Sequence, residues 1–257
     1  MQLNDPTLLK TRSYINGQWM PALSEETFTV YNPADGERIA DVASVGISET
    51  ELAIAAAEKA LRGWQEKTAD ERAKLLCDWY HQVVENRDDL ARIMTLEQGK
   101  ALVQSQAEIS YSASCIEWFA AEAKRLFSES ISHCISEKRP LTVQRPLGVV
   151  AAVTRWNIPN ALIAGKAAPA LAVGCTIVIQ PASETPLLAL AMVALAERVG
   201  IPAGVINVVT GSAREIATEL RRSSVVRKVT VSSFDRQAFQ CGLEDYMEIK
   251  YLCLQSA

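Results

Sequence analysis

The sequence lacks any run of roughly 18 consecutive apolar residues, the length that a membrane-spanning helix requires. Its first residues, MQLNDPTLLKTRSY, contain no apolar signal region. We therefore expect a cytoplasmic protein with no membrane partner. Basic runs are as short as Arg221-Arg222, and 30 acidic against 26 basic residues give a formal net charge of -4. That balance argues against nucleic acid as a partner.

The cysteines and histidines show no pattern of a metal site. The sequence has six cysteines but no C-x-x-C pair, and neither of its two histidines lies at ligand spacing from a cysteine. We expect no metal, and reduced, mostly buried thiols. Cys175 and Cys253 are the candidates for a substitute catalytic thiol, although neither has a neighbour in sequence that would lower its pKa. His81 and His133 have no evident partners in the sequence, and we expect them to be surface or satisfied histidines.

Several local signals predict a hairpin and a helical layer in the first third of the chain. Asn16-Gly17 lies between apolar residues, which favours a tight hairpin over residues 14–19. The segments 48–51 and 68–71 have the spacing of capping boxes, so each predicts a helix start. A third helix is predicted to end near Gly99 and a fourth to cover 101–127. In the first helix, helical spacing predicts one buried stripe: Ile54, Ala57, Leu61 and Trp64.

From Gly148 onward, short β-branched runs alternate with Ala/Leu-rich helices, the pattern of βαβ units around a parallel sheet. One helix is predicted to open at Pro159 and to close at Gly174, and another to be capped by Thr185. The fold class is therefore α/β, a partial parallel sheet of about four strands with an N-terminal helical layer. The predicted strands cover 148–153, 176–179, 205–209 and 226–231.

The alternation stops after Val231, because the segment 232–236 leads directly into a tail without another helix. Residues 246–251 of that tail alternate polar and apolar side chains with a period of two, as a half-buried strand does. Residues 141–145 alternate in the same way. The pattern predicts that these two distant segments pair as strands.

Ordered blocks of sequence over residues 12–231 resemble the aldehyde dehydrogenase superfamily, and specifically bacterial succinate-semialdehyde dehydrogenases. The tail 241–251, CGLEDYMEIKY, resembles the extreme C-terminus of the same enzymes. The resemblance implies a family member whose interior is missing between Val231 and Ser232. The blocks are MTLEQGKAL, EWFAAEAKR, RPLGVVAAVTRWNIPNALIAGKAAPALAVGC, QPASETPLLALAMVALAERVGIPAGVINVVTGSA and VVRKVTV.

In the family, the missing interior holds the last cofactor-domain strand with its Glu general base, and the whole domain that carries the nucleophilic Cys. The resemblance thus implies a hairpin and helical layer over 1–137, a Rossmann-like core over 148–231, and oligomerisation strands over 138–147 with 244–257, without a catalytic domain. The family reaction is the NAD(P)-dependent oxidation of an aldehyde to a carboxylate, and we expect this chain to be inactive in it. The alternatives are a dinucleotide-sensing or oligomerising partner of a full-length relative, and a residual oxidoreductase.

The resemblance assigns site residues at the ends of the first and third strands of this core. Asn157 matches the Asn that donates to the oxyanion in the family, and its alternative role is to cap the following helix. Thr154 and Trp156 match cofactor-groove positions, although Trp156 could equally be a buried packing residue. Gly211 follows the third strand, where the backbone could approach the adenosine. A simple turn would explain that glycine as well.

The end of the second strand carries the clearest departure from the family. Gln180, Pro181, Ala182 and Ser183 stand where the family has Lys-Pro-Ala-Ser/Glu, a motif whose lysine binds the adenosine ribose. Ser183 leaves room for a ribose 2′-phosphate, which indicates NADP in an ancestor, whereas the lost lysine charge weakens that preference. The cofactor implied is therefore NADP or NAD.

Further departures concern the pyrophosphate and the substrate. The family's Gly-Ser pair after the fourth strand is replaced by Ser232-Ser233-Phe234, and no G-x-G-x-x-G motif is present. Arg155 replaces the usual Pro, and Gly165 replaces an Arg that pairs with the substrate carboxylate in the succinate-semialdehyde enzymes. Because the last strand and the opposing domain are missing, we expect an exposed sheet edge and therefore oligomerisation, with itself or a full-length relative, or poor solubility.

Overall fold

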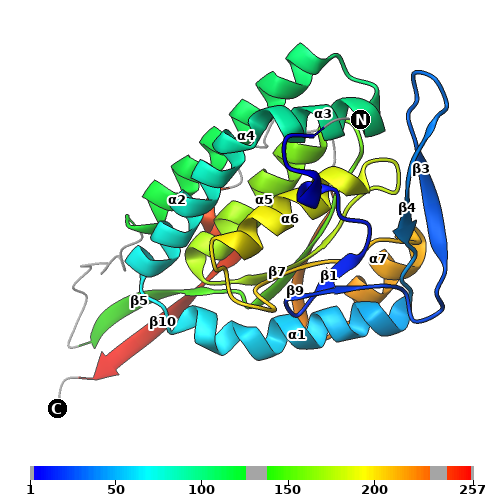
Figure 1. Cartoon of the computed structure of the whole chain (residues 1–257). Helices are drawn as coiled ribbons and strands as arrows, with labels where there is room; N and C mark the ends of the chain where they lie inside the picture. Colours follow the sequence, from blue (N-terminus) through cyan, green and yellow to red (C-terminus); the bar gives the residue numbers. More distant parts are fainter. Residues whose placement is uncertain (1–2, 126–137, 232–241, 256–257) are drawn as a thin grey trace.

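The computed structural model describes residues 3–125, 138–231 and 242–255, and its centre is a six-stranded sheet (Figure 1). Three neighbouring pairs, β8 with β7, β7 with β6 and β6 with β9, are parallel. The predicted α/β class is confirmed. The strands, in their order across the sheet, are β2 (Gln18–Met20), β1 (Ser13–Ile15), β8 (Ile206–Val208), β7 (Thr176–Gln180), β6 (Val149–Val153) and β9 (Val226–Val231).

The predicted parallel sheet of about four strands is confirmed by β8, β7, β6 and β9, and the N-terminal hairpin extends the same sheet with two antiparallel strands. Tyr14 of β1 pairs antiparallel with Val208 of β8. The backbone N–H of Asn16 also donates to Oδ1 of Asn207 at 2.9 Å. The hairpin itself is confirmed, since Asn16 and Gly17 take positive φ angles of 51° and 75° at its turn. The hairpin thus covers the edge that β8 would otherwise expose.

Helices cover both faces of the sheet. Two of them, α1 (Ile47–Gln65) and α7 (Ala213–Arg222), pack with the smaller of two apolar cores. The larger core joins the other face to α5 (Pro159–Val173) and α6 (Pro186–Arg198), with a further layer outside them (Figure 1). No helix within the described ranges is both long and apolar enough to span a bilayer. The outer layer consists of α2 (Ala69–Glu85), α3 (Arg87–Gln98) and α4 (Leu102–Ala123).

Most predicted helix boundaries are confirmed. Pro159 is the first residue of α5, and Gly174 ends it in the left-handed conformation with φ 99°. Gly99 ends α3 in the same way with φ 79°. The predicted stripe on α1 is buried at Ile54, Ala57 and Trp64 and partly buried at Leu61.

For two helices, the side chain predicted to cap the N-terminus does not make the capping hydrogen bond. The helix α1 begins at Ile47 after the N-cap Gly46, and the carboxylate of Glu49 accepts from the backbone N–H of Gly46 at 3.0 Å and of Leu23 at 2.6 Å. Ser48 is therefore not the cap. Thr185 does stand at the N-cap of α6, but its side chain makes no capping hydrogen bond. The box over 68–71 is confirmed.

A second hairpin was not predicted. The strands β3 (Thr27–Tyr31) and β4 (Arg38–Ala43) pair antiparallel and form a separate two-stranded sheet. The short helix η1 (Pro6–Leu8) precedes the first hairpin in the chain. Residues just after β4 return to the main sheet, since the backbone N–H of Val45 donates to the carbonyl of Thr210 at 2.8 Å.

The predicted pairing of the two distant strands is confirmed. The strand β5 (Lys138–Pro146) pairs antiparallel with β10 (Met247–Gln255) along its whole length. Before β10, the short helix η2 (Leu243–Tyr246) buries the ring of Tyr246, whose carbonyl accepts from the backbone N–H of Leu147 at 2.9 Å. Lys228 holds the same segment from β9, donating to the carbonyl of Asp245 at 2.6 Å. Ser232, Ser233 and Phe234 lie outside the described residues.

Candidate functional site

The candidate residues lie where the parallel strands end. The chain runs from β6 through β7 to β8 on one side of β6 and then returns to place β9 on the other side. In open α/β sheets, ligands bind beyond the carboxyl ends of the strands at such a switch in strand order. Residues 154–157 follow β6, residues 181–183 follow β7, and Gly211 lies shortly after β8. The topology therefore brings all the predicted site residues to the same side of the sheet, at the carboxyl ends of its parallel strands.

Trp156 and Asn157 follow β6, and for each of them the structure contradicts one of the two roles that the sequence allowed. Trp156 is 53% exposed, so it is not a buried packing residue. Asn157 does not cap α5, whose N-cap is Ile158 and which has no side-chain capping bond from that residue. Within the described part of the chain, Oδ1 of Asn157 is buried without a hydrogen-bond partner. The ring of Trp156 and Oδ1 of Asn157 are thus left with surface or hydrogen-bonding capacity that the described residues do not take up.

The backbone around Asn157 is held by its neighbours. Nε2 of Gln98 donates to the carbonyl of Asn157 at 2.7 Å. Thr154 is buried, and its backbone N–H donates to the carbonyl of Gln180 at 2.9 Å. The turn between β6 and α5 is therefore fixed from both α3 and β7.

Two carboxylates of the helical layer cap the helices that begin at this edge. Oε1 of Glu108, on α4, accepts from the backbone N–H of Asn160 at 3.1 Å, and the carboxylate is paired with Lys100. Glu97, on α3, accepts from the backbone N–H groups of Leu187 at 2.7 Å and Leu188 at 2.9 Å. Burial raises the pKa of Glu97 to about 8. These caps could not be singled out from the sequence, because each links elements far apart in the chain.

The end of β7 holds an unsatisfied amide. Gln180 is 1% exposed, and neither its Oε1 nor its Nε2 has a hydrogen-bond partner among the described residues. A buried polar group without a partner costs stability, so the position calls for a polar ligand or water. Pro181 is buried, Ala182 is partly buried and Ser183 is exposed.

Gly211 joins this edge to the segment between β4 and α1. Its carbonyl accepts from Oγ of Ser183 at 3.3 Å. Its φ is 148°, and a Cβ there would lie 2.4 Å from the carbonyl oxygen of Val45. Close packing of two backbones therefore requires glycine here, whether or not a ligand binds.

The two buried thiols of the described core are not prepared for nucleophilic chemistry. Burial raises the pKa of Cys115 to about 12 and that of Cys175 to about 11. The Sγ of Cys175 donates to the carbonyl of Tyr246 at 3.4 Å, a structural contact. The expectation of a surface or satisfied histidine is confirmed for His81, which is exposed and whose Nε2 lies 3.6 Å from Sγ of Cys77. The remaining cysteines, Cys134, Cys241 and the side chain of Cys253, lie outside the described residues, as does His133.

Two residues depart from the family pattern at positions concerned with the substrate, and their surroundings differ. Arg155 is exposed at the end of β6, whereas Gly165 is buried within α5. Gly165 has no side chain with which to meet a carboxylate. Within the described residues, no three His, Cys, Asp or Glu side chains are grouped so that they could hold a metal ion.

Comparison with known proteins finds semialdehyde dehydrogenases among the relatives of this chain. The chain is 49% identical over 255 residues to glutarate-semialdehyde dehydrogenase of Pseudomonas putida, a match that covers 99% of this chain and 53% of the relative. It is 50% identical over 255 residues to succinate-semialdehyde dehydrogenase [NADP(+)] of Escherichia coli, with the same shares of the two chains covered. The chain thus spans about half the length of the curated relatives it matches.

Solved structures give the same result. An E. coli NADP-dependent enzyme is similar with a TM-score of 0.89 at 47% identity, covering 95% of this chain and 51% of that one. Betaine aldehyde dehydrogenase of Staphylococcus aureus in complex with NAD+ is similar with a TM-score of 0.84 at 33% identity, covering 87% and 45% of the two chains. The family model described as "Aldehyde dehydrogenase family" matches residues 19–250. The chain therefore belongs to the aldehyde dehydrogenase family.

Proposed function

We propose that this chain is a dinucleotide-binding unit of an aldehyde dehydrogenase that does not oxidise aldehydes by itself. Aldehyde oxidation through a thioester needs an ionised thiol, donors for the oxyanion and a base that activates water. The observation that carries the proposal is the state of the two buried thiols of the described core, because burial raises the pKa of Cys115 and Cys175 far above neutrality. The half-length match to the relatives supports the same conclusion.

The residues at the ends of β6, β7 and β8 fit a dinucleotide. The unpartnered amide of Gln180 can both donate to and accept from ribose hydroxyls. The exposed ring of Trp156 offers an apolar wall, and the small side chain of Ser183 leaves space at the end of β7. NADP or NAD bound there would supply the hydride acceptor of the family reaction. We propose that Asn157, whose Oδ1 has no partner among the described residues, retains the position of an oxyanion donor.

Calorimetric titration with NAD, NADP and ADP tests the dinucleotide site. We expect binding of all three, and we expect Gln180→Ala to weaken it at least severalfold because the ribose loses its buried partner. The control is Gln104→Ala, since Gln104 is exposed on α4. The absence of any heat or thermal shift at millimolar nucleotide would refute the proposal.

The predicted lack of catalysis is tested separately with succinate semialdehyde and either nucleotide. We expect no turnover above the rate of a heat-denatured sample. Turnover by the purified chain, removed by a thiol reagent and protected by nucleotide, would instead establish the residual oxidoreductase. That outcome would leave the titration result unaffected.

We also propose that the chain assembles, with a second copy or with a full-length relative, through the β5 and β10 pair. The observation in favour is Ile249 of β10, which is 56% exposed although it is a large apolar side chain in a regular strand. The domain division 1–137, 148–231 and 138–147 with 244–257 is part of this proposal. Sedimentation velocity should show a dimer or larger species, and Ile249→Lys should shift it towards monomer. A stable monomer for the unmodified chain would contradict it.

A further inference from the structure

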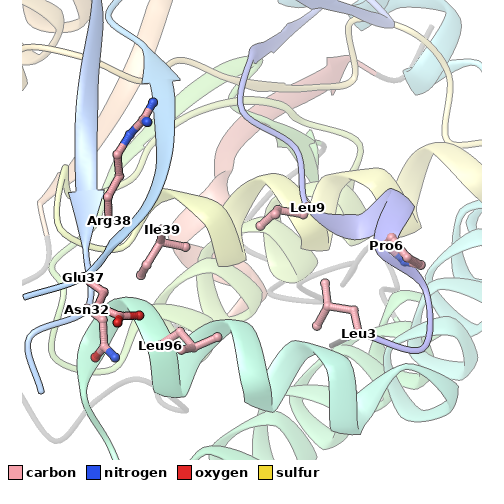
Figure 2. Close-up of a pocket in the computed structure, with 8 residues that line it drawn as sticks. All are labelled: Leu3, Pro6, Leu9, Asn32, Glu37, Arg38, Ile39 and Leu96. Atoms are coloured by element: carbon pink, nitrogen blue, oxygen red, sulfur yellow. The ribbon is translucent and has the colours of Figure 1, made fainter. Parts of the chain in front are cut away.

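A hollow elsewhere in the molecule shares no lining residue with the candidate dinucleotide site. It has a volume of about 370 Å³ and lies between the N-terminal segment, the β3 and β4 hairpin and α3 (Figure 2). That volume is at the lower end of the range of small-molecule sites, which is roughly 300–1,000 Å³. Its apolar wall consists of Leu3, Pro6, Leu9, Ile39 and Leu96.

The wall formed by the N-terminal segment is fixed on the core. The buried carboxylate of Asp89 accepts from the backbone N–H groups of Asn4 at 2.9 Å and Asp5 at 2.7 Å. Arg198 of α6 pairs with Asp5 at 2.7 Å and donates to Oγ1 of Thr7 at 2.6 Å. The hollow is therefore formed before any ligand arrives, and binding does not have to order this segment.

Four aliphatic side chains in the hollow are only partly buried: Leu3, Leu9, Ile39 and Leu96. Figure 2 shows them converging from three elements on one space. A hydrocarbon chain placed there would remove their remaining apolar surface from water, which favours binding.

One end of the hollow is acidic. Figure 2 shows Glu37 and Asn32 together beside Leu96, whereas Arg38 points away from them. Arg38 is occupied by Asp41, to which its Nε donates at 3.1 Å, and the amide of Asn32 donates to Asp35 at 2.7 Å. Among the described residues, no side chain pairs with the carboxylate of Glu37. This end therefore carries an uncompensated negative charge.

We propose that this hollow binds a protonated primary amine on a short aliphatic chain. The ammonium group donates to the carboxylate of Glu37, and the chain lies over Leu96, Ile39 and Leu9. A cation is favoured at this end and a carboxylate is repelled, so the site selects amines over acids of the same length. The proposal does not depend on dinucleotide binding, since the two sites share no residue.

Titration of the protein with hexylamine, hexanol and hexanoate, followed by NMR shifts of the methyl groups, tests the proposal. We expect saturable hexylamine binding that shifts the methyls of Leu9, Ile39 and Leu96, with hexanoate at least about tenfold weaker, a difference of one charge-assisted contact. Absence of saturation, or equal affinity for hexylamine and hexanoate, would overturn the proposal.

Three variants locate the site. Glu37→Gln should reduce the preference for hexylamine over hexanol by about tenfold, whereas Glu51→Gln, at an exposed position of α1, should leave it unchanged. Leu96→Phe should fill the hollow and abolish binding. Leu9→Phe is the second filling variant, for the case that the first fails to fold as judged by circular dichroism. Hexylamine binding that persists unchanged in a folded filling variant, or an unchanged preference in Glu37→Gln, would place the amine elsewhere and refute the proposal.

Discussion

The carboxylate of Glu97 can be removed by the substitution Glu97→Ala, which we expect to destabilise the protein strongly. The change leaves two buried backbone donors, those of Leu187 and Leu188, without their acceptor at the start of α6. An unsatisfied buried donor costs about 1–3 kcal/mol, so the loss of the acceptor for two donors should lower the free energy of unfolding by about 2–6 kcal/mol. Glu97→Gln keeps one acceptor oxygen and should cost about half as much.

Urea unfolding followed by circular dichroism measures this difference. The matched control is Glu58→Ala, because Glu58 is exposed on α1 and such surface changes usually stay within about 0.5 kcal/mol. A loss for Glu97→Ala no larger than that of the control would refute the argument that the outer helical layer caps the inner helices. So would a loss for Glu97→Gln that exceeds the loss for Glu97→Ala.

The carboxyl group of Glu97 should also make stability depend on pH, because burial raises its pKa from 4.5 to about 8. The contribution of Glu97 to the free energy of unfolding is therefore present below pH 4.5 and is lost as pH rises through 8. Glu97→Gln should remove that part of the slope, and an identical slope in the two proteins would contradict the assignment. Gly211→Ala should lower stability by more than about 1 kcal/mol, because its Cβ would meet the carbonyl of Val45, and an unchanged urea midpoint would show that the backbones separate easily. Cys115 and Cys175 should resist a thiol reagent at pH 7 until the protein unfolds, as mass spectrometry of labelled peptides would show, whereas rapid labelling of either in the native state would contradict its burial.

The parts of the fold predicted from sequence are those with local signals. Pro159, Gly174 and Gly99 mark helix ends through their own backbone preferences, which act whatever the tertiary structure. The period of two in 141–145 and 246–251 predicted two strands, and their shared pattern alone suggested that they pair. The β3 and β4 hairpin was missed, although Asp35-Gly36 between β-branched and aromatic residues is a recognisable turn signal.

The parts that were not predicted depend on which elements meet in space. Glu97 and Glu108 lie on helices that read as packing surface, and only the folded arrangement places each beside the start of another helix. The burial of Gln180 could not be deduced from its neighbours in sequence either. The sequence left two roles open for Asn157, that of an oxyanion donor and that of a helix cap. The structure excludes the capping role, because the nearby backbone donors at the start of α5 are already taken by Glu108.

The pairing of β5 with β10 has a consequence for how this family can change in length. About a hundred residues separate the two strands in this chain, and the entropic cost of closing such a loop grows only with the logarithm of its length, about 0.6 kcal/mol for each doubling. A contact between Lys228 and the segment before β10 already anchors the returning chain to the core. Gaining or losing a whole domain between residues 231 and 242 would therefore alter the cost of this pairing by about 1 kcal/mol. Strands that close a long interval tolerate large changes within it, which makes that interval a permissive place for insertion and deletion.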